Sequence, residues 1–151
     1  MPLRFELSST AKKPQDRSHI RISDAEIVEL SSAYRLYGCW RWEIDTGHFF
    51  ASEDVYEIFG MTFSKGPMNL VEVMSRIHED DKSIMAETYE QASLHKLGFH
   101  FIYRVGTADE GFRYVRSVGK FRNDDNSGGE IIGITYELLE RMRTVGFGEE
   151  A

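Results

Sequence analysis

The sequence has little cysteine and a deficit of positive charge. Its single cysteine, Cys39, excludes an internal disulfide. The formal net charge is −7, although residues 1–22 carry five Lys and Arg against two Asp and Glu, so the rest of the chain is more acidic than the whole. An acidic domain argues against binding to a nucleic-acid backbone, which requires clustered Lys and Arg.

Long apolar runs are also missing. No run is long enough to span a bilayer, and the N-terminus lacks the apolar segment of a secretory signal. We therefore expect no membrane association and a cytoplasmic location. With 151 residues, 41% hydrophobic and 28% charged, the chain has the length and composition of one soluble globular domain.

The beginning of the chain predicts a tail followed by one helix. Residues 1–22 are polar, short of aromatics and broken by two prolines, so we expect a flexible tail. A single domain is expected over residues 23–143, and a frayed end over 144–151. Ser23 and Glu26 have the spacing of a capping box, which predicts a helix from there to Tyr37, ended by Gly38.

This first helix carries an apolar stripe formed by Ile27, Leu30, Tyr34 and Tyr37. A stripe of this width needs a covering surface. It could cover a sheet of its own chain, or it could pair with a second copy of the chain. We therefore regard these four residues as a candidate cap or dimer helix.

The middle of the chain predicts a hairpin and a helical insert. Apolar and polar residues alternate over 39–44, a turn follows at 45–47, and a second short strand spans 48–51. Helices are expected over 52–59 and 69–77, each with a capping residue at its start. A longer helix is expected to about residue 96, capped by Asp80 or Asp81.

The last third of the chain predicts three antiparallel strands over 99–105, 112–122 and 131–136, joined by polar turns. Helix-forming residues over 137–143 predict a short final helix. The predicted fold class is α+β, with a five-stranded antiparallel sheet, a helical insert between the second and third strands, and an N-terminal flanking helix.

Several segments, in this order and at this spacing, resemble one family. They are Gly38–Gly47, Ser52 with Ile58–Gly60, Ile77–Asp81, Tyr103–Val105, Asp109–Val115 and Gly133–Leu139. The chain resembles a PAS domain, of the bacterial subgroup found in sensor kinases and cyclic-di-nucleotide enzymes. It departs from that pattern where Glu79 replaces a usual Pro, where Tyr114 replaces a common Trp, and at Glu137 and Leu139 in the terminal element.

The resemblance implies a non-catalytic sensory module in signal transduction. No phospho-acceptor His region, ATP-binding glycines or cyclase signature follows in this sequence, which predicts a stand-alone module. It would act by protein–protein interaction, either as a homodimer or by docking on a sensor kinase or regulator of a two-component system. A ligand or partner would shift the sheet relative to its flanking helices.

The alternative is a sensor that holds a flavin, haem or metabolite between the sheet and the helices. No covalently bound cofactor and no metal site are expected. The candidate walls of a ligand cavity are Trp42, Met74, His78, Tyr103, Tyr114 and Ile134. The many aromatic residues of the strands could equally be ordinary core, which is the commoner role.

Four features have a chemical and a structural interpretation. Cys39 could be a photoreactive thiol, but a free cysteine usually behaves as a small hydrophobe. His78 could be a haem ligand, yet it matches a position of the resembled family that fixes a loop. Carboxylates 79–81 are typical of a helix start. Residues 124–129 mimic the opening of a calcium loop but lack its closing Glu, so a hairpin turn is favoured.

The fourth predicted strand has apolar residues on both of its faces. Phe112, Tyr114 and Val118 share one parity, and Val115 and Phe121 share the other. One face should meet the helical insert. The other must be covered by the first helix, by a partner, or by both, which is the main sequence-level reason to expect a dimer.

Overall fold

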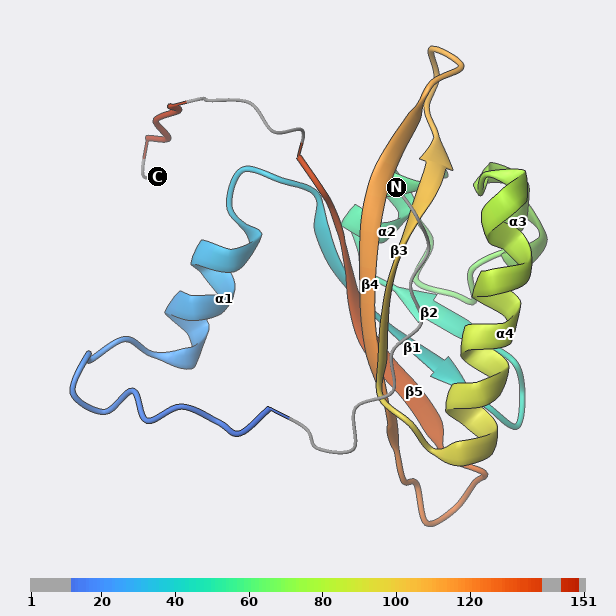
Figure 1. Cartoon of the computed structure of the whole chain (residues 1–151), viewed down its shortest axis with the longest axis horizontal. Helices are drawn as coiled ribbons and strands as arrows, with labels where there is room; N and C mark the ends of the chain where they lie inside the picture. The colour runs from blue at the N-terminus through green and yellow to red at the C-terminus, as the bar shows by residue number, and fades with distance from the viewer. Residues whose placement is uncertain (1–11, 140–144, 150–151) are drawn as a thin grey trace. The chain divides into compact units, whose positions relative to one another are not determined.

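Alternation of apolar and polar residues places five strands in one antiparallel sheet, in the order β2-β1-β5-β4-β3 (Figure 1). The structure is a computed structural model and describes residues 12–139 and 145–149. This arrangement confirms the predicted α+β class with a helical insert between the second and third strands. The strands are β1 (Tyr37–Glu43), β2 (Phe49–Ala51), β3 (Phe99–Gly106), β4 (Phe112–Arg122) and β5 (Glu130–Glu137).

The described residues contain four helices, and the chain divides into two units, residues 1–33 and 34–151. The first unit contains α1, and the second contains the sheet with the other three helices. Figure 1 shows α3 and α4 along one face of that sheet. The helices are α1 (Asp24–Ser32), α2 (Glu53–Ile58), α3 (Leu70–Arg76) and α4 (Glu79–His95).

The strand register divides the side chains between two faces of the sheet. Odd-numbered residues of β3, β4 and β5 and even-numbered residues of β1 point toward the helices, which we call the inner face. Trp40 lies on this face opposite Gly133, and Gly133 lies opposite Gly119, which in turn faces Phe99. Two aromatic rings therefore lie over a pair of glycines, with 6.3 Å between ring centroids.

The core lies between the inner face and the helical insert. Its most buried apolar members come from the helices α2 and α4 and from the strands β3, β4 and β5. Burial of these side chains is the main favourable contribution to folding. The members with the lowest exposure are Val55, Ile58, Ala92, Val105, Val115 and Ile131.

The predicted extent of the first helix is wrong. The capping box forms as predicted, because the Ser23 hydroxyl accepts the Glu26 amide and the Glu26 carboxylate accepts the Ser23 amide. The helix ends at Ser32, however, and Tyr34 has a left-handed backbone with φ of 62°. Tyr37 instead belongs to β1, where it lies opposite Tyr136 of β5 and its amide donates to Asp54 Oδ2 at 3.0 Å.

Ile27 and Leu30 are therefore the members of the predicted stripe that lie in α1. Within its unit, α1 has no buried residue. The roles of this helix as a cap or as a dimer contact stay predictions, as do the domain boundaries. The predicted final helix over 137–143 is replaced by strand up to Glu137, and its positions from 140 lie outside the described residues.

The start of α4 differs from the prediction by its cap. His78, and not Asp80 or Asp81, is the N-cap residue, and its Nδ1 accepts the Asp80 amide at 3.1 Å. The His78 amide donates to the Arg104 carbonyl of β3 at 3.0 Å. His78 thus fixes the loop between α3 and α4, as the family resemblance implies. Glu79, Asp80 and Asp81 occupy the first turn, where negative charge favours the helix dipole.

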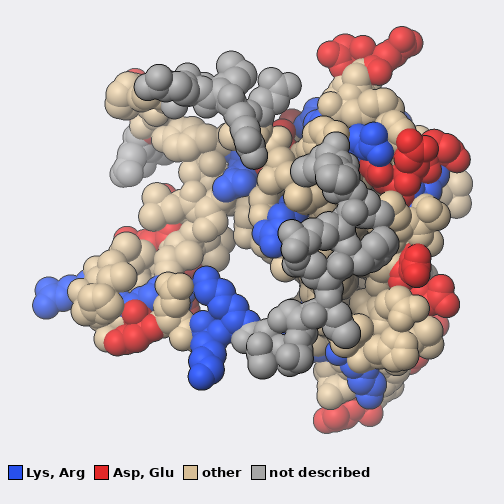
Figure 2. All heavy atoms as spheres, viewed as in Figure 1, with Lys and Arg blue, Asp and Glu red and all other residues tan. Residues whose placement is uncertain are grey.

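Acidic side chains gather over the helix-bearing side of the second unit, on the right of Figure 2. The first turn of α4 carries three acidic residues, Glu79, Asp80 and Asp81. In the part of the chain that the structure describes, no helix is both long and apolar enough to cross a membrane.

Candidate functional site

An apolar cavity of about 190 Å³ lies between the inner face and the helices. Its wall includes residues from β1, β2, β3 and β5 and from all three helices of the insert, and none of them is charged. Burying an unpaired charge among such residues is costly, so this cavity suits an uncharged occupant. We call it the inner cavity, and its lining residues are Trp42, Phe49, Val55, Phe59, Met68, Leu70, Val73, Met74, Met85, Ala86, Tyr89, Tyr103 and Thr135.

Three of the six predicted wall residues line the inner cavity, namely Trp42, Met74 and Tyr103. His78 lies at the start of α4 with its ring against Phe112, at 4.7 Å between centroids. Tyr114 and Ile134 have even numbers in β4 and β5, so they project from the opposite face of the sheet. Tyr114 and Ile134 were chosen by residue type. Strand parity, which that choice did not take into account, places them outside the cavity.

One polar residue of this wall, Thr135, was not predicted from the sequence, and it belongs to a row of hydrogen-bonded side chains. Trp40 Nε1 donates to Thr135 Oγ1 at 2.9 Å, Thr135 Oγ1 and Ser117 Oγ are 2.7 Å apart, and Ser117 Oγ and Tyr103 Oη are 3.0 Å apart. We call these four side chains the hydroxyl chain. They come from β1, β5, β4 and β3, one from each strand. The sequence could have indicated Ser117 and Thr135 as buried polar residues, because both have the odd numbers of the residues that face inward in β4 and β5.

Burial keeps the tyrosines of the inner cavity protonated. It raises the pKa of Tyr103 to about 12, although hydrogen bonds from Ser117 and Thr135 act in the opposite direction. Burial likewise raises the pKa of Tyr89 well above its ordinary value, with a smaller contribution from Tyr103. Both phenols are therefore hydrogen-bond donors, and not anions, at neutral pH.

A second, open hollow of about 600 Å³ lies on the other face of the sheet, which we call the outer face. The side chains of Phe50, Val118, Ile132 and Ile134 give it an apolar floor, and Cys39 lies among them. We call it the outer hollow. Apolar patches of this kind on a sheet are typical of interaction surfaces.

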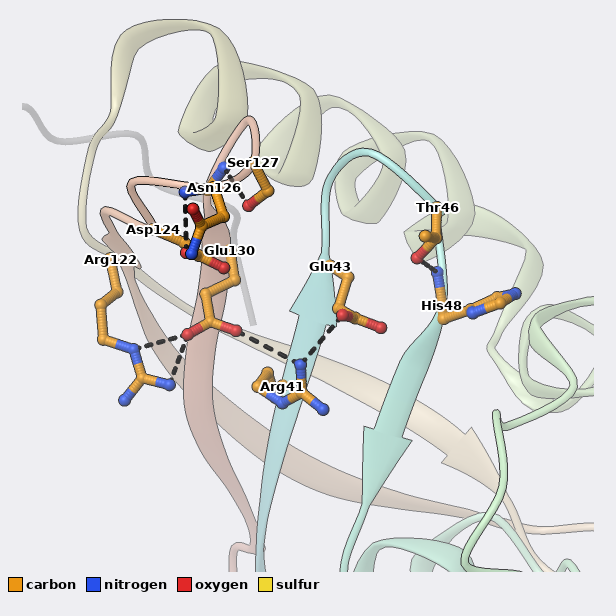
Figure 3. A network of polar contacts seen from close by, with 10 residues as sticks. Arg41, Glu43, Thr46, His48, Arg122, Asp124, Asn126, Ser127 and Glu130 are labelled. Carbon is orange, nitrogen blue, oxygen red and sulfur yellow. Dashed lines mark hydrogen bonds and ion pairs between the residues drawn. The ribbon is translucent and has the colours of Figure 1, made fainter.

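The rim of the outer hollow is charged. Glu130 lies between two arginines, with 3.4 Å from its Oε2 to Arg41 Nη1 and 2.7 Å from its Oε1 to Arg122 Nε (Figure 3). Arg41 also contacts Glu43 at 3.2 Å and lies over the Phe50 ring at 4.9 Å. An apolar floor with a polar rim that carries both signs is the usual composition of a protein–protein interface.

The nearby turn between β4 and β5 is a hairpin turn closed by its own side chains. Asp124 Oδ1 accepts the Asn126 amide at 3.2 Å, as Figure 3 shows. The Gly128 amide donates to Asp45 of the other hairpin at 2.8 Å. The first of these bonds occupies the Asp124 carboxylate, at the first position of the segment that mimics a calcium loop.

The inner cavity does not fit a flavin or a haem in this conformation. Its volume is below the range of about 300–1,000 Å³ typical of sites for drug-sized ligands, and close to that of about 150 Å³ cavities that hold benzene. Cys39 projects from the outer face, away from the cavity. The Nδ1 of His78 already accepts a helix amide. The two residues considered for light and haem chemistry therefore do not face this space.

Comparison with protein families gives one match. A family model described as the PAS fold matches residues 48–135, which is more than half of the chain. The chain belongs to the PAS fold family. The curated proteins contain no significant match. PAS domains are sensory modules and are generally non-catalytic, so this chain is a sensory or signal-transduction module.

Solved PAS structures share this fold at low sequence identity. The N-terminal domain of a diguanylate cyclase with a PAS/PAC sensor from Marinobacter aquaeolei is 17% identical, with a TM-score of 0.57, covering 67% of this chain and 94% of that one. A sensory box histidine kinase/response regulator from Burkholderia thailandensis is 21% identical, with a TM-score of 0.58 and coverages of 76% and 86%. A PAS domain from Colwellia psychrerythraea is 12% identical, with a TM-score of 0.54 and coverages of 78% and 100%.

Proposed function

We propose that this PAS domain signals through protein–protein contact on the outer face of its sheet, and that the contact is made with a second copy of the chain. The outer hollow is the observation that carries this proposal. Its floor consists of aliphatic and aromatic side chains from β2, β4 and β5. Burial of such a floor against a partner is favourable in proportion to the apolar area removed from water.

A second copy suits this surface because a two-fold dimer places the same patch on both subunits. An apolar floor is complementary to itself. The rim is also self-complementary, since it offers Arg41 and Arg122 together with Glu43 and Glu130. The homodimer would then bias a kinase or regulator when the sheet shifts against its helices.

The test is the mass of the protein in solution, measured by light scattering after size exclusion. We expect the wild type to be a dimer and Ile134→Glu to be a monomer, because the substitution puts a charge on the apolar floor. The matched control is Val71→Glu, on α3 of the helical side, where the side chain is 82% exposed. This control should leave the dimer intact.

Two results would count against the proposal. A monomeric wild type would refute the homodimer. A dimer that persists in Ile134→Glu would place the contact elsewhere in the chain. Thermal unfolding of both variants, followed by circular dichroism, separates a lost contact from a lost fold.

A second function is favoured by a different observation, the uncharged inner cavity. We propose that it holds a small metabolite, whose binding shifts the sheet against the helices. The volume of about 190 Å³ suits a compact molecule larger than water and smaller than a flavin. Native mass spectrometry of the freshly purified protein tests this, since a bound molecule adds mass that denaturation removes. It also reports the copy number in the same experiment.

A further inference from the structure

A row of side chains crosses the outer face beside the outer hollow. Ile102 of β3 lies opposite Arg116 of β4 in the strand register. Arg116 lies opposite Tyr136 of β5, which in turn lies opposite Tyr37 of β1. Arg35, two residues before Tyr37, places its guanidinium over the Tyr136 ring, 4.8 Å from the centroid. We call these five residues the Tyr–Arg row, and none of them lines the outer hollow.

The tyrosines of this row hold its two guanidinium groups in place. Tyr136 stacks on Tyr37 at 5.4 Å between ring centroids, with 13° between the ring planes. The Tyr136 hydroxyl accepts Arg116 Nη1 at 2.6 Å, and the Arg116 guanidinium lies 5.9 Å from the centroid of the same ring. A guanidinium over an aromatic ring is attracted by the negative face of that ring. Both arginines are therefore oriented by one tyrosine.

Neither arginine of the row has an acidic partner. Among the residues that the structure describes, no carboxylate is within ion-pair distance of Arg35 or Arg116. Two carboxylates near the first residues of β1 bond to the backbone instead. Asp54 accepts the Tyr37 amide at 3.0 Å, and Glu137 accepts the amide of the residue that follows Arg35 at 2.9 Å. The row therefore offers two positive charges that no described side chain neutralises.

This charge pattern distinguishes the Tyr–Arg row from the proposed dimer contact. The rim of the outer hollow carries both signs of charge, so a second copy can be complementary to it. The row carries positive charge alone, and a two-fold contact centred on it would bring like charges together, which is unfavourable. A partner that covers the row must supply negative charge.

From these contacts we infer that the Tyr–Arg row is a docking site for an acidic segment of another protein. Carboxylates of the segment bind the guanidinium N–H groups that the row itself leaves unused. Its apolar side chains pack on the tyrosine rings and on Ile102, which is 38% exposed. Tyrosine and arginine are among the residues that carry most binding energy at protein interfaces. The inference goes beyond the proposed homodimer and does not depend on it.

The charge of the unit that contains the row favours a short acidic segment over a nucleic acid. Residues 1–33 carry five Lys and Arg and five Asp and Glu, so the net charge of −7 falls on residues 34–151. A nucleic-acid backbone would extend beyond the row onto this acidic surface and be repelled by it. A short segment meets the row alone, because charges more than about 8 Å away are largely screened at physiological ionic strength.

The test is a titration of the full chain with the acidic peptide acetyl-EELEEL-amide, followed by NMR. We expect the largest shifts at the backbone amides of Tyr37, Arg116 and Tyr136, and weaker binding as salt is added. The double variant Arg35→Gln, Arg116→Gln should bind the peptide about tenfold more weakly, the loss expected for a hydrogen bond to a charged group. The neutral peptide acetyl-QQLQQL-amide should bind the wild type as weakly as the acidic peptide binds the double variant.

A matched control separates this site from a general effect of charge. Arg116→Gln alone should weaken peptide binding, whereas Lys65→Gln should leave it unchanged. Lys65→Gln also removes one positive charge, from an exposed position in the loop between α2 and α3. Circular dichroism and the melting temperature of each variant establish that the fold is intact.

Several outcomes would overturn the inference. The acidic peptide might fail to bind the wild type, bind the double variant equally well, or shift amides outside the row. Tighter binding of a single-stranded oligothymidylate than of the peptide would assign the row to nucleic acid. A double variant that loses the wild-type dimer in light scattering would assign the row to the contact between copies.

Discussion

Replacement of Gly133 by alanine tests the packing that seats Trp40 on the sheet. A Cβ atom at this position would lie 2.3 Å from the Val118 carbonyl oxygen and 2.4 Å from Cζ2 of Trp40. Ordinary contacts of a Cβ lie at 3.4–4 Å, so both distances are short by about 1 Å or more. The carbonyl belongs to the neighbouring strand and cannot rotate away. The Trp40 ring is buried and stacked on Phe49, at 5.2 Å between centroids.

The expected cost is at the upper end of the range for overpacking, about 3 kcal/mol. For a chain of this length, a loss of that size lowers the melting temperature by roughly 10 °C. The clash would also tilt the indole and weaken the Trp40–Thr135 hydrogen bond, which begins the hydroxyl chain. Gly133→Ala should therefore perturb the Trp40 indole N–H signal before it unfolds the domain.

The assay is urea unfolding together with thermal unfolding, both followed by circular dichroism. Gly106→Ala is the matched control, because a Cβ there would meet only the Arg76 carbonyl oxygen, at an ordinary 3.5 Å. Alanine in place of glycine without strain is neutral or stabilises by about 0.4–1 kcal/mol. If Gly133→Ala melts within a few degrees of Gly106→Ala, the packing argument for the glycine pair is refuted.

Two further predictions concern stability. The Arg104 guanidinium donates to both oxygens of Asp81 and lowers the pKa of that carboxyl below its ordinary value of 3.8. The ionised pair therefore stabilises the fold fully above pH 3.8, and this stabilisation is lost as the pH falls through the lowered pKa. Asp81→Asn should therefore lower the melting temperature at pH 7, by an amount that shrinks below pH 3.8, and a difference independent of pH would contradict this account. Ile58→Ala, at a side chain that is 1% exposed, should cost about 3 kcal/mol in urea unfolding, whereas a cost under about 1 kcal/mol would mean that the core closes around the missing atoms.

The sequence by itself determined the elements and their order. Alternation over β1 and the long runs of β3, β4 and β5 reflect a local rule, since successive side chains of a strand point to opposite faces. The capping box of α1 is likewise a contact between residues three apart. The motifs between Gly38 and Leu139 added the family, which the comparison with the PAS fold confirms over residues 48–135.

The ends of elements were decided by tertiary contacts. Helix-forming residues continue past Ser32, yet Tyr37 pairs with Tyr136, and the two rings stack at 5.4 Å. His78 caps α4 because its backbone is fixed by Arg104 of β3, a residue far along the chain. Local propensity does not contain such partners, so it placed the helix end and the cap at other residues.

The candidate site shows the same division. The sequence pointed to Trp42, Met74 and Tyr103 as cavity walls, and to Tyr114 and Ile134, which strand parity places on the outer face. The hydroxyl chain joins four strands that are adjacent only because β5 pairs with both β1 and β4. Its hydrogen bonds depend on distances between side chains of four different strands, which the tertiary structure alone sets.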